Sequence, residues 1–229
     1  MSKPRLYQLV DKTGRGSSPF VWRIRYALLH KGIEYDVVPV RFSDIPRIGN
    51  GKFATVPILE REGRFINQSW AIAEWLDVAY PKRPRLFGSP AEFAMVSFFD
   101  KWFGTSVMPP MFKSCLAEIF KTIPAEDRKY FRATRERELG ESIEVVGSRS
   151  SEYVNDLRSA LLPLRLTLRR TAYIGGDWPN YADHIVWGCF AAFSPVANCR
   201  LLAEDDTLLD WLSRGYELMG GIPCDWALR

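Results

Sequence analysis

Short predicted strands and helices alternate over the first part of the chain, and their order limits the folds that it can adopt. Residues 5–10 (RLYQLV) and 33–40 (IEYDVVPV) are apolar runs typical of strands. Between them, apolar residues recur at helical spacing from Ser18 to Lys31. This order predicts a parallel strand–helix–strand unit.

A second unit follows directly. Residues 56–60 (VPILE) and 64–67 (RFIN) flank a short turn containing Gly63, which predicts an antiparallel hairpin. Residues 68–80 (QSWAIAEWLDVAY) place apolar side chains on one helical face. A βαβ unit followed by a ββα unit is the thioredoxin arrangement, so we expect a thioredoxin-like α/β domain over residues 1–80.

The remaining chain carries helical patterns alone. Residues 81–90 (PKRPRLFGSP) hold three prolines and indicate a linker. Residues 91–229 therefore form a predicted all-α domain, in which Asn180 and Asp183 have the spacing of a capping box. The expected helices cover residues 91–121, 125–146, 151–172, 180–193 and 205–219.

Composition and charge narrow the possible partners. The 229 residues are 47% apolar and 25% charged, and no apolar run is long enough to span a bilayer, so no membrane association is expected. Residues 1–80 contain 12 basic and 8 acidic side chains, whereas residues 81–229 contain 19 of each. The sequence has no basic run interleaved with aromatic residues, which is the pattern that would indicate nucleic-acid binding. The excess in the first domain favours a small anionic ligand instead.

Cysteine and histidine are too few and too scattered for a metal site. The four cysteines have irregular spacing and form no C-x-x-C pair, and there are only two histidines. We therefore expect no zinc site and no disulfide framework, as is typical of a protein in a reducing cytoplasm.

The start of the first predicted helix has the form of a redox loop without its sulfur. Where a thiol-disulfide loop holds cysteine, proline, an aromatic residue and cysteine, this chain has Ser18, Pro19, Phe20 and Val21. Ser18 followed by Pro19 is a helix N-cap followed by an N1 proline. The positive end of a helix favours an anion there, and a serine hydroxyl can donate to a thiolate that arrives with a ligand. The alternative is an ordinary capping serine.

Two further segments extend this prediction. A cis proline at Val56-Pro57 turns the backbone of the preceding residue toward an extended peptide. Gln68 and Ser69, at a helix start, offer N–H, amide and hydroxyl groups to a carboxylate, although a plain helix cap is the simpler interpretation. Sites for a thiolate, a peptide backbone and a carboxylate together describe glutathione.

The chain resembles the cytosolic glutathione transferases along essentially its whole length. The resemblance rests on Ser18-Pro19, Val56-Pro57, Gln68-Ser69 with the following AIAEWL, and Asn180-x-x-Asp183. More narrowly, SPFVWRIRYALLHKG, YPKRPRLF and GGDWPNYAD are similar to the bacterial β-etherase-type transferases and their fungal etherase-related relatives.

The resemblance implies a role for each matching residue. Ser18 is the expected catalytic hydroxyl that stabilises the thiolate, although the neighbouring Ser17 leaves the choice of hydroxyl open. The γ-glutamyl end of glutathione is expected at Gln68 and Ser69, and its cysteinyl unit at the Val56 backbone. The glutathione-binding residues implied in this way are Ser17, Lys52, Val56, Pro57, Gln68 and Ser69.

The electrophile is expected against an apolar wall. Residues 98–115 concentrate five aromatic residues and two methionines, and Pro109-Pro110 is expected to break the helix there. The alternative is that most of these side chains belong to the core. The expected wall residues are Phe20, Trp102, Phe103, Met108, Met111 and Phe112.

These expectations describe a cytoplasmic, homodimeric transferase of the detoxification type. It would use glutathione as co-substrate, need no metal, and attack an aromatic electrophile, with cleavage of a β-aryl ether as the narrower expectation. One alternative is a non-catalytic protein that binds glutathione or another ligand on the same fold. Another is a thiol-disulfide oxidoreductase, which Ser18 and Val21 oppose because they occupy the two redox positions.

Overall fold

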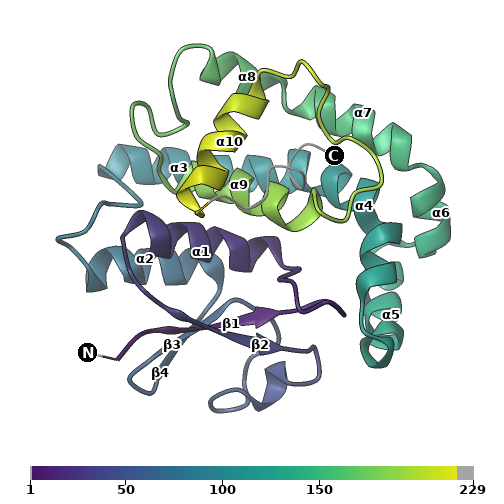
Figure 1. The fold of residues 1–229 in the computed structure, drawn as a ribbon, viewed down its shortest axis with the longest axis horizontal. Coiled ribbons are helices and arrows are strands. Elements are labelled where there is room, and N and C mark those ends of the chain that lie inside the picture. Colours follow the sequence, from purple (N-terminus) through teal and green to yellow (C-terminus); the bar gives the residue numbers. More distant parts are fainter. Residues whose placement is uncertain (1, 221–229) are drawn as a thin grey trace.

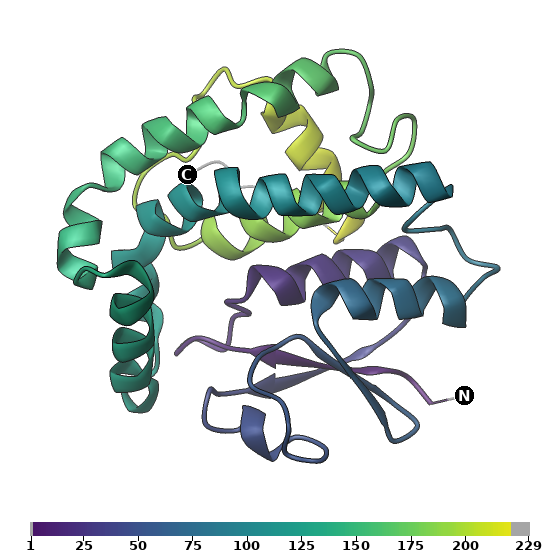
Figure 2. The same ribbon diagram turned by 180° about the vertical axis from the view of Figure 1, so that it is seen from behind.

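The computed structural model describes residues 2–220 of the chain. A small sheet carries two helices on one face, and a larger group of helices lies beyond those two helices (Figures 1 and 2). The elements of the sheet region are β1 (Arg5–Leu9), α1 (Pro19–His30), β2 (Asp36–Val40), the 3-10 turn η1 (Ile45–Arg47), β3 (Ile58–Arg61), β4 (Arg64–Asn67) and α2 (Ser69–Ala79).

The sheet has the strand order β2-β1-β3-β4. β1 and β2 are parallel, while β3 pairs antiparallel with both β1 and β4. Pro39 lies in β2 at the edge of the sheet, where its missing N–H removes no interior ladder bond. The mixed four-stranded sheet confirms the thioredoxin-like fold expected for the first part of the chain.

The later part of the chain is helical, and no strand forms between residues 90 and 220. No helix within residues 2–220 has the length and apolar character needed to cross a bilayer. The elements are α3 (Pro90–Trp102), the π-helical turn η2 (Phe103–Val107), α4 (Met108–Thr122), the 3-10 turn η3 (Ala125–Asp127), α5 (Arg128–Leu139), α6 (Ile143–Ser148), α7 (Ser150–Ala160), α8 (Leu162–Leu168), α9 (Tyr181–Phe193) and α10 (Leu208–Leu218).

Two helices expected to be continuous are interrupted, whereas the break expected at Pro109-Pro110 was wrong, because the chain stays helical from α3 through η2 into α4. Pro109 and Pro110 lie in the first turn of α4, where proline is tolerated, and the π-helical turn at 103–107 precedes them. Gly140, with φ 74°, ends α5 in the left-handed conformation that suits glycine. Pro163 likewise lies in the first turn of α8 and separates it from α7. Proline and glycine thus set the helix boundaries.

Helix α9 forms the centre of the helical region and packs against α1. All of its residues are buried. A Cβ at Gly188 would lie 2.8 Å from the Arg23 nitrogen and 2.9 Å from the Pro19 oxygen, so only glycine permits this close approach. The predicted capping box is confirmed, because Asn180 accepts from the Ala182 N–H and Asp183 accepts from the Asn180 N–H. The contact with α1 therefore lies beside the start of the first helix.

A buried ion pair ties the proline-rich segment to both helices of the sheet region. Lys31 Nζ donates to Asp77 Oδ1 at 2.6 Å and to the Pro84 carbonyl oxygen at 2.8 Å. The Asp77 carboxylate also accepts the N–H groups of Leu86 and Phe87. The Lys31 side chain has no exposed surface, so this pair meets the condition that a buried charge be partnered.

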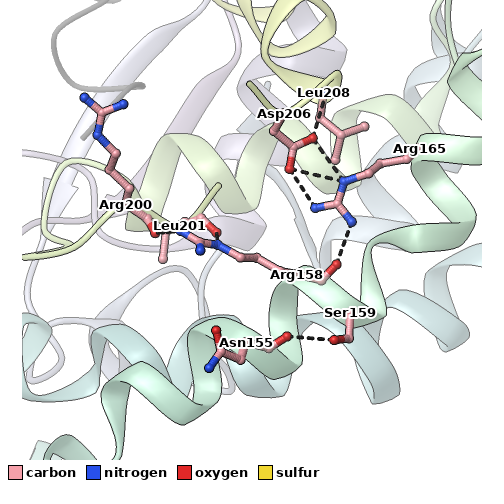
Figure 3. A network of polar contacts seen from close by, with 8 residues as sticks. All are labelled: Asn155, Arg158, Ser159, Arg165, Arg200, Leu201, Asp206 and Leu208. Carbon is pink, nitrogen blue, oxygen red and sulfur yellow. Dashed lines mark hydrogen bonds and ion pairs between the residues drawn. The ribbon is translucent and has the colours of Figure 1, made fainter. Parts of the chain in front are cut away.

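A second network joins α7, α8 and α10 (Figure 3). Arg165 donates through Nε and Nη2 to the Asp206 carboxylate, and through Nη1 to the Arg158 carbonyl oxygen. Asp206 also accepts the Leu208 N–H at the start of α10, and Arg158 donates to the Leu201 carbonyl oxygen. Residues far apart in sequence thus fix the start of α10.

Candidate active site

The start of α1 places a serine hydroxyl at a helix N-terminus. Ser18 is the N-cap, with extended backbone dihedrals, and Pro19 occupies the first helical position. The Ser18 Oγ accepts a hydrogen bond from the Val21 N–H at 3.4 Å. Because this bond uses an oxygen lone pair, the hydroxyl hydrogen of Ser18 is available to another acceptor. The helix N-terminus adds a positive partial charge at the same place.

The neighbouring Ser17 uses its hydroxyl differently. Its Oγ lies 3.4 Å from the carbonyl oxygen of Leu9, which can only accept, so the Ser17 hydroxyl is the donor. The Ser17 N–H also donates to the Leu9 oxygen, at 3.1 Å. Ser17 therefore fastens the loop to the end of β1.

The loop before β3 lies beside this helix start. The Val56-Pro57 peptide bond is cis, in agreement with the expectation from the sequence. Asn67 Nδ2 donates to the carbonyl oxygens of Thr55 and Pro57, each at 2.8 Å. Asn67 thus braces the loop from both sides of Val56, a role that the sequence analysis did not assign to it.

The start of α2 leaves the Gln68 side chain uncommitted, whereas the Ser69 hydroxyl lies against the side chain of Tyr181. Gln68 is the N-cap but has a φ of 75° and makes no side-chain capping bond. A positive φ is uncommon for a residue with a side chain, and such strained positions gather at functional sites. Ser69 is the first helical residue and is largely buried.

A cavity of about 470 Å³ brings these three segments together with the helical region. Its volume lies within the range usual for small-molecule sites. The expected site residues that line it are Ser17, Ser18, Phe20, Val56, Pro57, Gln68, Ser69, Met108 and Phe112.

Four of the expected site residues do not line this cavity. Lys52 is exposed on the loop before Val56. Phe103 and Met111 have no exposed surface and belong to the core, and Trp102 packs partly buried against Phe99. For Met111 the phase of α4 explains the difference, since Met108 and Phe112 are four residues apart and share the face turned to the cavity.

Other lining residues were not anticipated from the sequence. Phe42 follows β2, and its ring centroid lies 5.4 Å from that of Tyr130 on α5. Helix α5 also supplies Phe131, Arg135 and Glu138. No local pattern marks these residues, because they reach the cavity only through the return of α5 toward the sheet region (Figure 2). The further lining residues are Leu9, Pro19, Ile45, Ala54, Thr55, Ile119, Ile123 and Phe193.

None of the three cysteines that the structure describes lines the cavity. Cys115 and Cys189 are buried, and burial raises the pKa of the Cys115 thiol to about 12. Burial also raises the pKa of Cys189. Cys199 is half-buried, and Cys224 lies outside the described residues. Neither buried thiol has the depressed pKa of a catalytic cysteine.

The two histidines pack against each other. The ring centroids of His30 and His184 are 5.1 Å apart. Burial lowers the pKa of both, so both are neutral at neutral pH. Within residues 2–220, no group of three or more His, Cys, Asp and Glu side chains could hold a metal ion.

Two family models match the chain. The one described as "Glutathione S-transferase, N-terminal domain" covers residues 17–79, and the one described as "Glutathione S-transferase, C-terminal domain" covers residues 94–204. Among curated proteins, "Glutathione S-transferase omega-1" of Rattus norvegicus is 24% identical over 205 residues, 87% of this chain and 73% of that protein. "Glutathione transferase GST 23" of Zea mays is 28% identical over 195 residues, 82% of this chain and 73% of that protein.

Solved structures share the fold. Glutathione transferase GSTFuA3 from Phanerochaete chrysosporium superposes with a TM-score of 0.85 at 23% identity, covering 95% of this chain and 98% of its own. CsGST83044 of Ceriporiopsis subvermispora, solved in complex with glutathione, superposes with a TM-score of 0.78 at 21% identity. The match covers 96% of this chain and 98% of that structure's chain. Glutaredoxin 2 from Salmonella typhimurium, also in complex with glutathione, superposes with a TM-score of 0.74 at 14% identity, and the match covers 100% of both chains.

Proposed function

Because the chain belongs to the glutathione S-transferase family, we propose that it binds glutathione in the cavity and transfers its thiolate to a hydrophobic electrophile. The observation that carries the proposal is the Ser18 hydroxyl at the start of α1, with its hydrogen uncommitted and its side chain on the cavity wall. A hydrogen bond from this hydroxyl, together with the helix N-terminus, stabilises a thiolate over a thiol.

The hydrogen bonding of the two serines favours Ser18 as the catalytic residue. Ser17 already donates its hydroxyl hydrogen to the Leu9 carbonyl oxygen. Ser18 only accepts within the protein, from Val21. A donor is what a sulfur anion requires, so the proposal assigns thiolate stabilisation to Ser18 and loop attachment to Ser17.

The rest of glutathione is assigned to the two neighbouring segments. The Val56 backbone, beside Pro57 and braced by Asn67, is proposed to pair with the cysteinyl unit. Gln68 and Ser69 are proposed to hold the γ-glutamyl end, since the Gln68 side chain is not used as a helix cap. Lys52 does not line the cavity. Its positive charge is therefore proposed to attract the glycyl carboxylate from a distance, without direct contact.

The electrophile is assigned to the apolar side of the cavity. Phe20, Met108 and Phe112 lie there with Phe42 and Tyr130, and aromatic rings with methionines suit an aromatic ligand. In the transfer step the thiolate sulfur bonds to a carbon of the electrophile, and the bond from that carbon to its leaving group breaks. In a β-aryl ether the leaving group is an aryloxide, which then takes up a proton from water.

We also propose a cytoplasmic homodimer. Met95 and Phe98 on α3 are 64% and 66% exposed, three residues apart and hence on one helical face, and exposed apolar side chains of this size favour an interface. The unpaired thiols of Cys115, Cys189 and Cys199 fit a reducing compartment. Sedimentation should give twice the chain mass, and Phe98→Glu should give a monomer.

The direct test is turnover with glutathione and a chlorodinitrobenzene. The protein should form the conjugate well above the uncatalysed rate and should not reduce a small disulfide. Binding of glutathione without turnover would establish a carrier protein instead, and disulfide reduction would establish an oxidoreductase. Release of a phenol from β-aryl ether compounds tests the narrower reaction.

A further inference from the structure

The cavity contains a single cationic side chain. Among the described residues that line it, Arg135 is the only lysine or arginine and Glu138 the only carboxylate. Both belong to α5, whereas the serines and Gln68 belong to the sheet region. The positive charge therefore lies on the wall assigned to the electrophile and not among the groups assigned to glutathione.

Aromatic rings hold the Arg135 guanidinium at this wall. Its Cζ lies 5.5 Å from the ring centroid of Phe131 and 5.9 Å from that of Phe112, both within the range of cation–π contact. The Arg135 Nε is buried and has no hydrogen-bond partner within residues 2–220. Because Nε is enclosed, a ligand oxygen in the cavity would accept from the Nη nitrogens instead, and Nη1 is held by Glu138.

The existing partner of Arg135 is easily replaced. Arg135 Nη1 donates to Glu138 Oε2 at 2.5 Å, across a spacing of three residues on one helix. The Glu138 side chain is 63% exposed and that of Arg135 is 32% exposed. Ion pairs of this exposed kind are weak, because water competes for both charges. A ligand anion that also packs against the aromatic wall can take the place of Glu138.

We propose that Arg135 is a specificity-determining residue that selects electrophiles whose aromatic ring carries an acidic oxygen group, a carboxylate or a phenolate. This inference rests on the proposed transferase function. The ring packs against Phe112 and Phe131, the acidic oxygen accepts from the guanidinium, and the reacting carbon faces the start of α1. A planar guanidinium suits this task because it offers several donors in a fixed geometry.

Arg135 and Glu138 should have opposite effects on the binding of an acidic electrophile. Arg135 attracts the acidic group, while Glu138 competes for the same donors and repels the same charge. Removing the positive charge should therefore weaken an acidic electrophile, and removing the negative charge should strengthen it. A neutral electrophile of the same shape should respond to neither change.

The experiment compares a chlorodinitrobenzoate with its methyl ester. With both compounds the glutathione sulfur bonds to the ring carbon that carries chlorine, and chloride leaves. The variants are Arg135→Gln and Glu138→Gln. The matched control is Arg137→Gln, which removes the same charge from an exposed position of the same helix outside the cavity wall. Calorimetric binding of an unreactive dinitrobenzoate in the presence of glutathione supplies a readout independent of turnover.

Arg135→Gln should raise KM and Kd for the acid by about 10-fold or more, as expected for loss of a hydrogen bond to a charged group. Glu138→Gln should lower both by about twofold, the scale of an exposed ion pair. Arg137→Gln should leave KM and Kd for the acid unchanged. For the ester, Arg135→Gln and Glu138→Gln should leave both constants unchanged. Equal effects on acid and ester, or weaker acid binding in Glu138→Gln, would overturn the proposal. Charge-dependent binding without any turnover would instead refute the transferase function and leave this site standing.

Discussion

The hydroxyl oxygen of Ser18 lies 3.4 Å from the backbone nitrogen of Val21 and accepts its hydrogen. The bond caps α1 and orients the hydroxyl group, because the oxygen is held against the first turn of the helix. Ser18 lines the cavity, so its hydroxyl can donate its hydrogen to a group bound there. One residue thus both begins the helix and offers a donor at its positive end.

Ser18→Ala should lower kcat by about 10–100-fold, because a hydrogen bond to a charged group contributes about 1.5–3 kcal/mol. Steady-state kinetics with saturating glutathione measures this change. Loss of the cap alone costs about 1 kcal/mol of stability and should not affect chemistry.

Two control variants separate these effects. Ser89→Ala removes an N-cap from α3, where Ser89 Oγ accepts from the Glu92 N–H at 3.2 Å, and should destabilise the protein without loss of turnover. Ser17→Ala should alter the loop at Leu9 but leave most of the activity. The assignment fails if Ser17→Ala abolishes turnover and Ser18→Ala does not.

Ser69→Ala should raise KM for glutathione by about 10-fold and leave kcat nearly unchanged, because its interaction is expected to be equal in the ground state and the transition state. Ser69 does not cap α2, but its buried side chain contacts Tyr181, so a thermal melt beside the kinetics separates any loss of stability from loss of binding. An unchanged KM in a protein of normal stability would mean that the γ-glutamyl end binds elsewhere.

The cysteines should be dispensable for catalysis. Replacing Cys115, Cys189, Cys199 and Cys224 by serine one at a time should leave kcat within about twofold, because none of the three described cysteines lines the cavity and the two buried thiols are poor nucleophiles. Burial keeps the pKa of Cys115 at about 12 and raises that of Cys189. Abolished activity in any one variant that still folds would refute this prediction.

The sequence predicted the parts of the site that depend on short segments. Ser18-Pro19, Val56-Pro57 and Gln68-Ser69 each sit where a strand or helix begins, and local chemistry is enough to mark such places. The cis bond at Val56-Pro57 and the cap at Ser18 agree with the structure. The mixed sheet follows from the same local order of elements.

The apolar wall could not be predicted in the same way. Composition marked residues 98–115 as a wall, but helical phase decides which side chains reach the cavity, and the π-helical turn before Pro109 shifts that phase. Phe103 and Met111 are therefore buried, while Met108 and Phe112 line the cavity. Tyr130 and Arg135 reach it only because α5 folds back against Phe42, and such long-range placement leaves no local pattern.

The Arg165–Asp206 pair should make stability depend on pH. Burial opposes ionisation of Asp206, but the hydrogen bonds from Arg165 and the Leu208 N–H outweigh it and lower the pKa of this carboxyl. A folded-state pKa below the unfolded value stabilises the protein above about pH 4, and the stabilisation disappears as the pH falls through the folded pKa. Asp206→Asn should therefore reduce the free energy of unfolding by about 1–3 kcal/mol at neutral pH.

Urea unfolding at neutral pH and at about pH 3 measures this difference, which should shrink in acid as the wild-type carboxyl becomes protonated. Asp205→Asn, at the exposed neighbouring position, is the control and should change little at either pH. If the free energies of unfolding of Asp206→Asn and wild type differ by the same amount at both pH values, the ionised Asp206 carboxylate is not the source of the stabilisation.

The most direct test of the account is the pKa of glutathione's thiol when it is bound to the protein, followed through the ultraviolet absorbance of the thiolate. In the wild type this pKa should fall from about 8.5 to about 7 or below, as for thiols at helix N-termini. Ser18→Ala should raise it again by about 1–2, the equivalent of one hydrogen bond to a charged group, while Ser17→Ala should leave it near the wild-type value. The same thiol pKa in wild type and Ser18→Ala, with glutathione bound to both, would contradict the claim that Ser18 stabilises the thiolate.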